Sequence, residues 1–351
     1  MSLPDDDKKS DRKIIEPQPS LVSYIHSRPY SNHFHRQLPT FAEPIPQLSI
    51  CSNLVCSFKN KKPSPVFSVQ WTNHGKRAII GCDSGEFLLW SGINFKYESL
   101  IQVHNCGVRV MKWTKNYQFM ISGDSKGYII VSKNNMKALK QEHGHEESVR
   151  DLSFAPGDGS KFVSCSDDRL GKIWDFSSMR IERELSGHGW DVKCCDWHPF
   201  KSLVATGSKD SLVKLWDPKS SRELCNVHAH NNAVTKTKWS INGNFLLTGS
   251  KDSLIKLYDL RTMKEFQVFR QHSKEVSSLT WHPFHEELFV SGGFDGSLGF
   301  WITGYDECAC FIPNAHSGVI RDAAWHPLGH LLATGSKDCS TKFWSRVGIT
   351  N

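Results

Sequence analysis

Histidine, serine and aspartate recur together at similar spacings in this sequence, and such a combination could hydrolyse a bond. The sets are His145, Ser166 and Asp168; His188, Ser208 and Asp210; His230, Ser250 and Asp252; and His316, Ser336 and Asp338. A serine becomes nucleophilic when a histidine accepts its proton and a carboxylate orients that histidine. A catalytic triad is needed once, however, so its repetition favours a structural role. We therefore expect no catalytic residues, and we expect loss of Asp210 to lower stability.

Cysteine and histidine are abundant, but their spacing does not suit a metal site. The chain has 11 Cys and 17 His, with Cys194 next to Cys195 and no Cys-x-x-Cys pair. A structural zinc site needs paired ligands at short spacing. We expect reduced thiols in a nuclear or cytosolic compartment, no metal and no cofactor.

Further motifs and the composition narrow the classes of function. The sequence has no Walker phosphate loop, Gly-x-Gly-x-x-Gly, His-Glu-x-x-His or nucleophile elbow, so we expect neither an enzyme nor a small-molecule substrate. It also has no long apolar run and no apolar signal region at its start, so we expect no membrane partner. The formal net charge of +7 suggests an acidic or nucleic-acid partner.

The elements that carry these residues are set by a repeat of tryptophan. One series is spaced by 41 to 44 residues: Trp71, Trp113, Phe154, Trp197, Trp239, Trp281 and Trp325. A second is interleaved at 41 to 43 residues: Trp90, Val131, Trp174, Trp216, Tyr258, Trp301 and Trp344. Together they hold 11 of the 12 Trp, and Trp190 alone is left over. Between them, short alternating runs such as Leu212–Trp216 and turns such as Lys209–Ser211 predict strands throughout.

The repeat unit resembles the WD-repeat family. Gly187-His188 is followed by Trp216-Asp217, and Gly144-His145 by Trp174-Asp175, with looser copies elsewhere. The resemblance implies one four-stranded propeller blade per repeat, with the repeated His, Ser and Asp in a hydrogen-bond network with the blade Trp. The expected fold is all-β, a seven-bladed WD-repeat propeller. Lys62 stands where the first His belongs, and Ser132 where one Asp belongs.

The ends of the repeat region predict how the ring closes. After Trp344 too few residues remain for a fourth strand, whereas Leu54–Phe58 is strand-like and precedes the first repeat. We expect a strand near 54–58 to complete the last blade, which removes open sheet edges. The expected domains are a propeller over 51–351 and an extended, Pro-containing basic arm over 1–50, with at most one short helical stretch near Ser20–His26.

Several runs resemble one branch of the family, the WD-repeat subunits of the cleavage and polyadenylation specificity factor. They include Ser84–Gly92, Asp191–Pro199, Gly207–Ser211, His285–Phe289 and Ala324–His330. The resemblance implies a nuclear subunit that helps to bind the AAUAAA signal of pre-mRNA. It also implies two partners, a zinc-finger subunit and a large multi-propeller scaffold subunit.

The same resemblance suggests an RNA-binding set. In that branch a basic arm lies along the RNA and an aromatic residue on the first blade stacks on a base, which matches Lys8, Lys9, Arg12 and Lys13 in the arm and Phe95 and Tyr97 after Trp90. Single-stranded RNA is bound by aromatic stacking and by cations on phosphates. Alternatively, the arm is a nuclear localisation signal or a solvated tail, and the two aromatics, expected on one face of a fourth strand, pack between blades.

A second set is a candidate for binding a partner. Arg109, Arg150, Lys193 and Arg321 each lie five residues after the repeat His, so we expect them to surround one mouth of the channel, where they bind RNA or an acidic partner or are merely solvated. Trp190 is expected in a surface loop, as a protein contact or as local packing. The expected function is thus a non-enzymatic RNA-recognition and scaffold subunit. The alternative is an interaction adaptor, such as a ubiquitin-ligase substrate receptor or a chromatin scaffold, that does not bind RNA.

Overall fold

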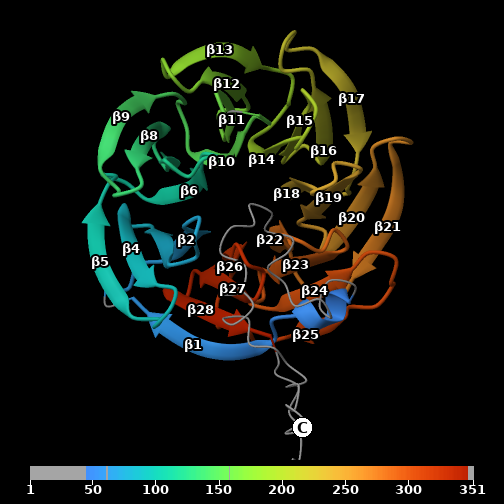
Figure 1. Ribbon diagram of the computed structural model, residues 1–351. Coiled ribbons are helices and arrows are strands. Elements are labelled where there is room, and N and C mark those ends of the chain that lie inside the picture. Colours follow the sequence, from blue (N-terminus) through green and yellow to red (C-terminus); the bar gives the residue numbers. More distant parts are fainter. Residues whose placement is uncertain (1–44, 61, 158, 347–351) are drawn as a thin grey trace, which may run out of the picture. The chain divides into compact units, whose positions relative to one another are not determined.

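The computed structural model describes residues 45–60, 62–157 and 159–346. These residues form seven antiparallel sheets of four strands each, and one short 3-10 helix, η2 (Pro46–Ser49). The fold class is therefore the expected one, an all-β propeller of seven blades (Figure 1). No helix in the described residues has the length and apolar character of a membrane span.

Each of the first six blades is built from four strands that follow one another in the chain. The first contains β2 (Val66–Trp71), β3 (Arg77–Cys82), β4 (Glu86–Ser91) and β5 (Tyr97–Gln102), and the second β6 (Val108–Trp113), β7 (Phe119–Asp124), β8 (Tyr128–Lys133) and β9 (Ala138–His143). The third contains β10 (Val149–Phe154), β11 (Lys161–Ser166), β12 (Gly171–Asp175) and β13 (Arg180–Leu185), and the fourth β14 (Val192–Trp197), β15 (Val204–Ser208), β16 (Leu212–Trp216) and β17 (Glu223–His228). The fifth contains β18 (Val234–Trp239), β19 (Phe245–Ser250), β20 (Leu254–Asp259) and β21 (Lys264–Arg270), and the sixth β22 (Val276–Trp281), β23 (Leu288–Gly293), β24 (Leu298–Ile302) and β25 (Cys310–Ile312).

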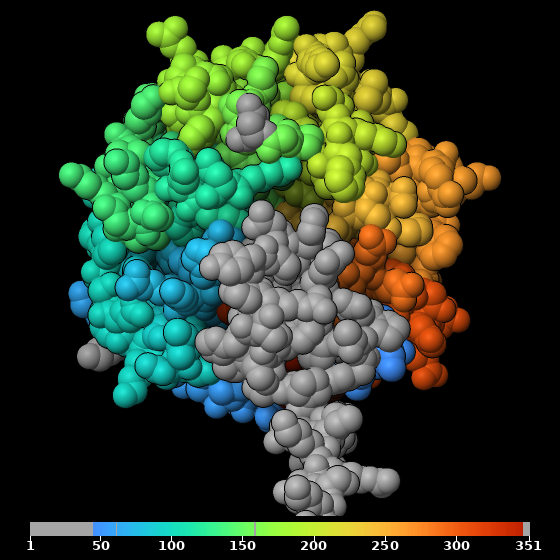
Figure 2. Space-filling view, in the orientation of Figure 1, coloured from blue at the N-terminus to red at the C-terminus, as the bar shows by residue number. Residues whose placement is uncertain are grey.

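The seventh blade joins the two ends of the propeller. It contains β26 (Ile320–Trp325), β27 (Leu331–Ser336), β28 (Ser340–Ser345) and, as its fourth strand, β1 (Asn53–Lys59). β1 pairs with β28 from Asn53 opposite Ser345 to Lys59 opposite Ser340. The blue of β1 therefore lies beside the orange-red of the last blades at the rim in Figure 2. This pairing leaves no blade of the ring with three strands.

The segment just before β1 also belongs to the propeller. Ser49, in the part of the chain expected as an arm, is buried, and its hydroxyl lies 2.8 Å from Nε2 of His285. The Cys51 thiol contacts the carbonyl oxygen of His330 at 3.4 Å. Residues 45–51 are therefore packed against the sixth and seventh blades.

The core lies between neighbouring blades and is filled by the repeated aromatics. Trp174, Trp216 and Trp301 are among the largest fully buried side chains. Each hydrophobic cluster draws residues from two adjacent sheets, as where Val66 and Trp90 of the first blade pack with Phe343 of the seventh. Because one face of a sheet cannot bury its apolar side chains alone, each blade depends on the next.

The strand order gives the propeller two distinct faces. The first strands β2, β6, β10, β14, β18, β22 and β26 surround the centre, each in contact with the next (Figure 1). One face, the mouth face, carries the loops between blades and the turns between second and third strands, which bond to each other, as in Asp83 N–H to Pro65 O at 2.9 Å. The opposite face carries the other turns, as in Gly92 N–H to Lys76 O at 2.7 Å.

Candidate functional site at the channel mouth

A β-bulge at the start of every first strand creates a ring of side chains at the mouth face. In all seven blades the pairing of first and second strands shifts by one residue at this point, for example between Val108 and Val110. The extra residue of a bulge is unpaired, and its side chain is re-aimed. The seven bulge residues, here called the mouth ring, are Phe67, Arg109, Arg150, Lys193, Thr235, Ser277 and Arg321.

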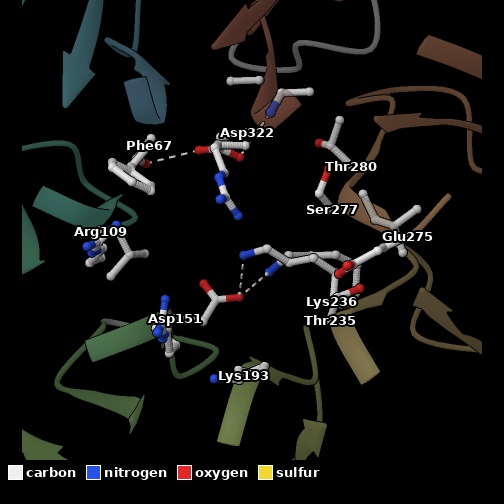
Figure 3. Close-up of a pocket in the computed structure, with 18 of the residues that line it drawn as sticks. Phe67, Arg109, Asp151, Lys193, Thr235, Lys236, Glu275, Ser277, Thr280 and Asp322 are labelled. Atoms are coloured by element: carbon white, nitrogen blue, oxygen red, sulfur yellow. Dashed lines mark hydrogen bonds and ion pairs between the residues drawn. The ribbon is translucent and has the colours of Figure 1, made fainter. Parts of the chain in front are cut away.

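The mouth ring lines a cavity of about 750 Å³ that follows the first strands into the propeller. Figure 3 shows Phe67, Arg109, Lys193, Thr235 and Ser277 arranged around it. The structure thus brings together all four expected basic residues. Trp190 lines the same cavity, so all five candidates for partner binding lie at one place.

Carboxylates behind the ring neutralise part of its charge. Arg150 forms an ion pair with Asp167, with its Nε 2.7 Å from the carboxylate. Lys193 is held by the same Asp167 at 2.7 Å and by Asp191 at 2.9 Å. Burial opposes ionisation of Asp191, but its bond with Lys193 outweighs this effect and lowers its pKa. These two cations are therefore positioned and largely compensated.

Below the ring lies a second charged layer that is balanced. Asp151 is 1% exposed, with Lys236 Nζ at 3.1 Å and Lys238 Nζ at 3.9 Å from its carboxylate (Figure 3). Burial opposes ionisation of Asp151, but the two lysines outweigh it and lower its pKa. The same pairing raises the pKa of Lys236 against the effect of burial. Removing either partner of such a buried pair leaves the other charge buried without compensation, which is strongly destabilising.

Trp190 is the aromatic residue that the repeat did not explain, and it stands at the rim of the cavity. It lies in the loop between the third and fourth blades and is 56% exposed. Its carbonyl oxygen accepts a hydrogen bond from Ser208 at 3.0 Å, which holds the loop. Lys209 Nζ lies 5.0 Å from the ring centroid. The indole is thus presented to solvent beside a cation.

Phe95 and Tyr97 lie far from the mouth ring, and they do not share one strand as expected. β5 begins at Tyr97, whereas Phe95 is in the preceding turn with a φ of 51°. Phe95 packs between the first and seventh blades, 5.3 Å from the Phe343 ring. Tyr97 is 43% exposed, with its ring 5.6 Å from that of Trp90. Tyr97 is therefore the accessible one of the two, at the opposite face of the first blade.

The four basic residues expected to contact RNA from the arm, Lys8, Lys9, Arg12 and Lys13, lie outside the described residues, as does the stretch Ser20–His26.

The repeated His and Asp form the expected network with the blade Trp, but through a different hydroxyl. Nδ1 of His188 lies 2.9 Å from Asp210 and its Nε2 2.8 Å from Oγ1 of Thr206, which also accepts a bond from Trp216 at 2.7 Å. The expected Ser208 instead accepts the Asp210 N–H and donates to the loop carbonyl. Thr206 lies in the middle of β15 and Ser208 at its end, so Ser208 bonds the turn and the loop while Thr206 reaches His188.

The same network recurs in the third and seventh blades through Ser164 and Thr334. The fifth and sixth blades keep only part of it, because Tyr258 replaces the indole beside Thr248 and Ser297 replaces the carboxylate beside His272. In the second blade Ser122 takes this place beside His104. Burial opposes ionisation of Asp210, but hydrogen bonds from His188 and two backbone N–H groups lower its pKa. The polar groups thus satisfy one another in the interior, which a buried network requires.

In the described part of the chain, no group of three or more His, Cys, Asp or Glu side chains is placed to hold a metal ion. The 11 cysteines are free thiols, and burial raises the pKa of Cys51, Cys82 and Cys194 to about 12.

Sequence reasoning missed three residues of the mouth ring, Phe67, Thr235 and Ser277, and three further residues that line the cavity. Phe67 occupies the ring position of the first blade, where Lys62 replaces the repeat His and obscures the spacing. Lys209, Lys251 and Phe294 follow second strands and reach the same cavity. Their signal was present, because each lies directly after the small residues that end a second strand, at the same place in three blades.

Comparison with known proteins gives two kinds of match. The family model "WD domain, G-beta repeat" matches residues 136–175, 179–217 and 307–345. The model "Anaphase-promoting complex subunit 4 WD40 domain" matches residues 224–283. These segments cover parts of the second to seventh blades.

Relatives match along nearly the whole chain. The protein named "Polyadenylation factor subunit 2" of Cryptococcus neoformans is 46% identical over 340 residues, covering 96% of this chain and 46% of the relative. Proteins of the same name are 34% identical in Candida albicans, over 95% of this chain and 66% of the relative, and 38% identical in Neurospora crassa, over 91% and 53%. The chain thus spans about half to two thirds of the length of these relatives.

Proposed function

Because the chain belongs to the WD-repeat family and is a homologue of the fungal polyadenylation factor subunit 2 proteins, we propose that it acts in mRNA 3′-end processing. We infer that it is a non-catalytic subunit of the nuclear cleavage and polyadenylation machinery. The observation that carries the proposal is the identity of 34 to 46% over most of the chain. Its expected partners are a zinc-finger subunit and a large multi-propeller subunit.

The finer part of the proposal is that the chain helps to bind the AAUAAA signal. Tyr97 supports it, since this aromatic ring is 43% exposed on the outermost strand of the first blade. Stacking of a base on an aromatic side chain contributes roughly 1 to 3 kcal/mol. Phe95 packs between the first and seventh blades and is not itself the stacking residue in this proposal. Arg12 and Lys13 would neutralise phosphates from the arm.

The RNA proposal is tested by equilibrium binding of an AAUAAA RNA to the reconstituted complex. Tyr97→Ala should weaken binding about 5- to 150-fold, which corresponds to the stacking energy, whereas Tyr97→Phe should bind like the wild type. Tyr305→Ala is the matched control, because Tyr305 is equally accessible, at 59%, in the sixth blade. Arg12→Glu with Lys13→Glu should also weaken binding. Unchanged affinity in the Tyr97 and arm variants would place the RNA elsewhere.

Membership in the complex is tested separately, by affinity purification of the tagged chain from nuclear extract. The proposal expects co-purification of a zinc-finger protein and a multi-propeller protein together with polyadenylation activity. The alternative, an adaptor of a ubiquitin ligase, is favoured by one observation, the match of residues 224–283 to a WD40 domain of the anaphase-promoting complex. Recovery of ubiquitin-ligase subunits in place of the processing factors would favour that alternative.

A further inference from the structure

Two arginines of the mouth ring lack the carboxylates that neutralise their neighbours. Among the described residues no carboxylate lies within ion-pair distance of Arg321, and the nearest one to Arg109 is Asp83 at 3.6 Å, which is 44% exposed. Arg150 and Lys193, in contrast, share Asp167 and contact it closely. The uncompensated charge is therefore concentrated where the seventh, first and second blades meet.

Phe67 stands between these two arginines and holds them at the mouth. The guanidinium carbon of Arg109 lies 4.0 Å from the centroid of the Phe67 ring, and that of Arg321 lies 5.5 Å away. Arg321 is also 5.8 Å from the ring of Phe294. Planar guanidinium groups stack on aromatic faces and still direct their N–H groups outward. Aromatic rings thus position both arginines, and Arg109 has in addition only the partly exposed Asp83.

Each arginine also keeps a hydrogen-bond donor without a partner. The Nε atoms of Arg109 and Arg321 are buried and make no hydrogen bond within the described residues. Burial lowers the pKa of Arg321, and repulsion from Arg109 and Arg150 lowers it further. An unpaired buried donor on a charged group is costly. An anion beside the two guanidinium groups would offset the repulsion between them.

The balance of charge indicates how many negative charges such an anion carries. The rim of the cavity has six cations, namely Arg109, Arg150, Lys193, Lys209, Lys251 and Arg321. Four carboxylates pair with or adjoin them, namely Asp83, Asp167, Asp191 and Glu275. The deeper layer is neutral, because Lys112, Lys236 and Lys238 face Asp151, Asp196 and Asp322. The mouth therefore has an excess of two positive charges.

We propose that the channel mouth binds a phosphorylated peptide segment of a protein partner, with the phosphate between Arg109 and Arg321. A phosphomonoester carries about −1.5 to −2 charges near pH 7 and three strong acceptor oxygens, which matches the excess charge of the mouth. Arginine forks bind phosphate in a bidentate manner. The cavity of about 750 Å³ below the ring accommodates the phosphorylated side chain.

The rim favours a peptide over RNA or a small polyanion. Trp190 and Phe294, 56% and 38% exposed, present apolar rings on either side of the cationic sector, and exposed Trp beside Arg is typical of protein contacts. One phosphomonoester places about two negative charges at a single position, whereas RNA spreads one charge per nucleotide along its backbone. The mouth also lies on the face away from Tyr97, so this inference is independent of the proposed RNA site.

The test uses the full chain and a pair of degenerate peptide libraries that differ only in a central phosphoserine or serine. The immobilised protein should retain the phosphoserine library, and a fluorescent peptide selected from it should bind in fluorescence anisotropy at 150 mM NaCl. Arg321→Gln and Arg109→Gln should each weaken binding of this peptide at least tenfold. Arg261→Gln is the matched control, since Arg261 is 76% exposed and paired with Asp259 on the opposite face.

The remaining arms of the experiment decide the kind of ligand. Trp190→Ala should weaken binding of the peptide but leave binding of inorganic phosphate, measured by competition, unchanged. Equal binding of the serine library, or an unchanged affinity in Arg321→Gln with a native circular dichroism spectrum, overturns the proposal. So does displacement of the peptide by inositol hexakisphosphate or by an RNA hexamer at lower concentration than by a second phosphopeptide.

Discussion

Replacing Thr206 separates hydrogen bonding from packing as the source of blade stability. Its side chain is 1% exposed, and its hydroxyl is the shared partner of Nε2 of His188 and Nε1 of Trp216 at 2.8 and 2.7 Å. Thr206→Val keeps the shape but leaves a buried indole N–H and an imidazole nitrogen without partners. At about 1 to 3 kcal/mol for each unsatisfied group, the loss should be about 2 to 6 kcal/mol.

Thr206→Ser gives the opposite perturbation. It keeps the hydroxyl and both bonds but removes one buried methyl group, which costs about 1 kcal/mol. Urea unfolding, followed by both tryptophan fluorescence and circular dichroism, gives the free energies if the two curves coincide. We expect the order of stability wild type, then Ser, then Val. Packing alone predicts a Val variant at least as stable as the Ser variant, because Val keeps the buried shape and Ser loses a methyl group. That result would refute the reasoning.

The fifth blade provides a control for the role of the indole. Tyr258 replaces the Trp there, and its hydroxyl donates to the carbonyl oxygen of Ala229 at 3.1 Å rather than to Thr248. Thr248 still contacts His230 at 2.9 Å. Thr248→Val therefore leaves no indole N–H without a partner. Its loss of unfolding free energy should be about 1 kcal/mol smaller than that of Thr206→Val.

Three other outcomes follow from burial. Burial lowers the pKa of His272 and His326 from 6.5 to about 4. Between these pH values the unfolded chain binds more protons than the folded one, so the urea midpoint should fall as the pH is lowered from 7 to 5. A midpoint that does not change with pH would contradict this. Phe58→Ala should lower the free energy of unfolding by about 2 kcal/mol, because its ring lies 4.1 Å from that of Trp90. Leu54→Ala should lower it by less than about 1 kcal/mol, because that side chain is 43% exposed. Equal unfolding midpoints of the two variants would contradict this expectation. Cys194, with a pKa of about 12, should resist iodoacetamide at pH 8 until urea unfolds the chain, as mass spectrometry would report.

The repeat made the architecture predictable, and it also placed part of the mouth. Once Trp and His mark each blade, any residue at a fixed offset falls at an equivalent place, which is why Arg109, Arg150, Lys193 and Arg321 could be grouped from sequence. The bulge that directs these side chains toward the mouth is a backbone feature, and no residue type in the sequence predicts it. The same limit explains Phe67, since the first repeat lacks the His from which the offset is counted.

Errors arose where two residues competed for one role. Ser208 and Thr206 are both small hydroxyl residues two positions apart on β15, so the alternation of the strand puts them on one face, and their place along the strand decides which of them reaches His188. Phe95 was expected on a strand with Tyr97, but its left-handed backbone, with a φ of 51°, ends the turn and directs the ring between blades. Local backbone geometry, rather than residue type, settled both cases.

The pairing of β1 with β28 has a consequence for how the protein is made. β1 is the first strand of the propeller to leave the ribosome, and its partner, Ser340–Ser345, is among the last. Until then β1 has no partner strand, and the unfinished ring presents open sheet edges. Contacts between such distant segments form slowly, and exposed edges favour aggregation during synthesis. Nascent chains of this protein should therefore need protection by chaperones until the seventh blade has emerged.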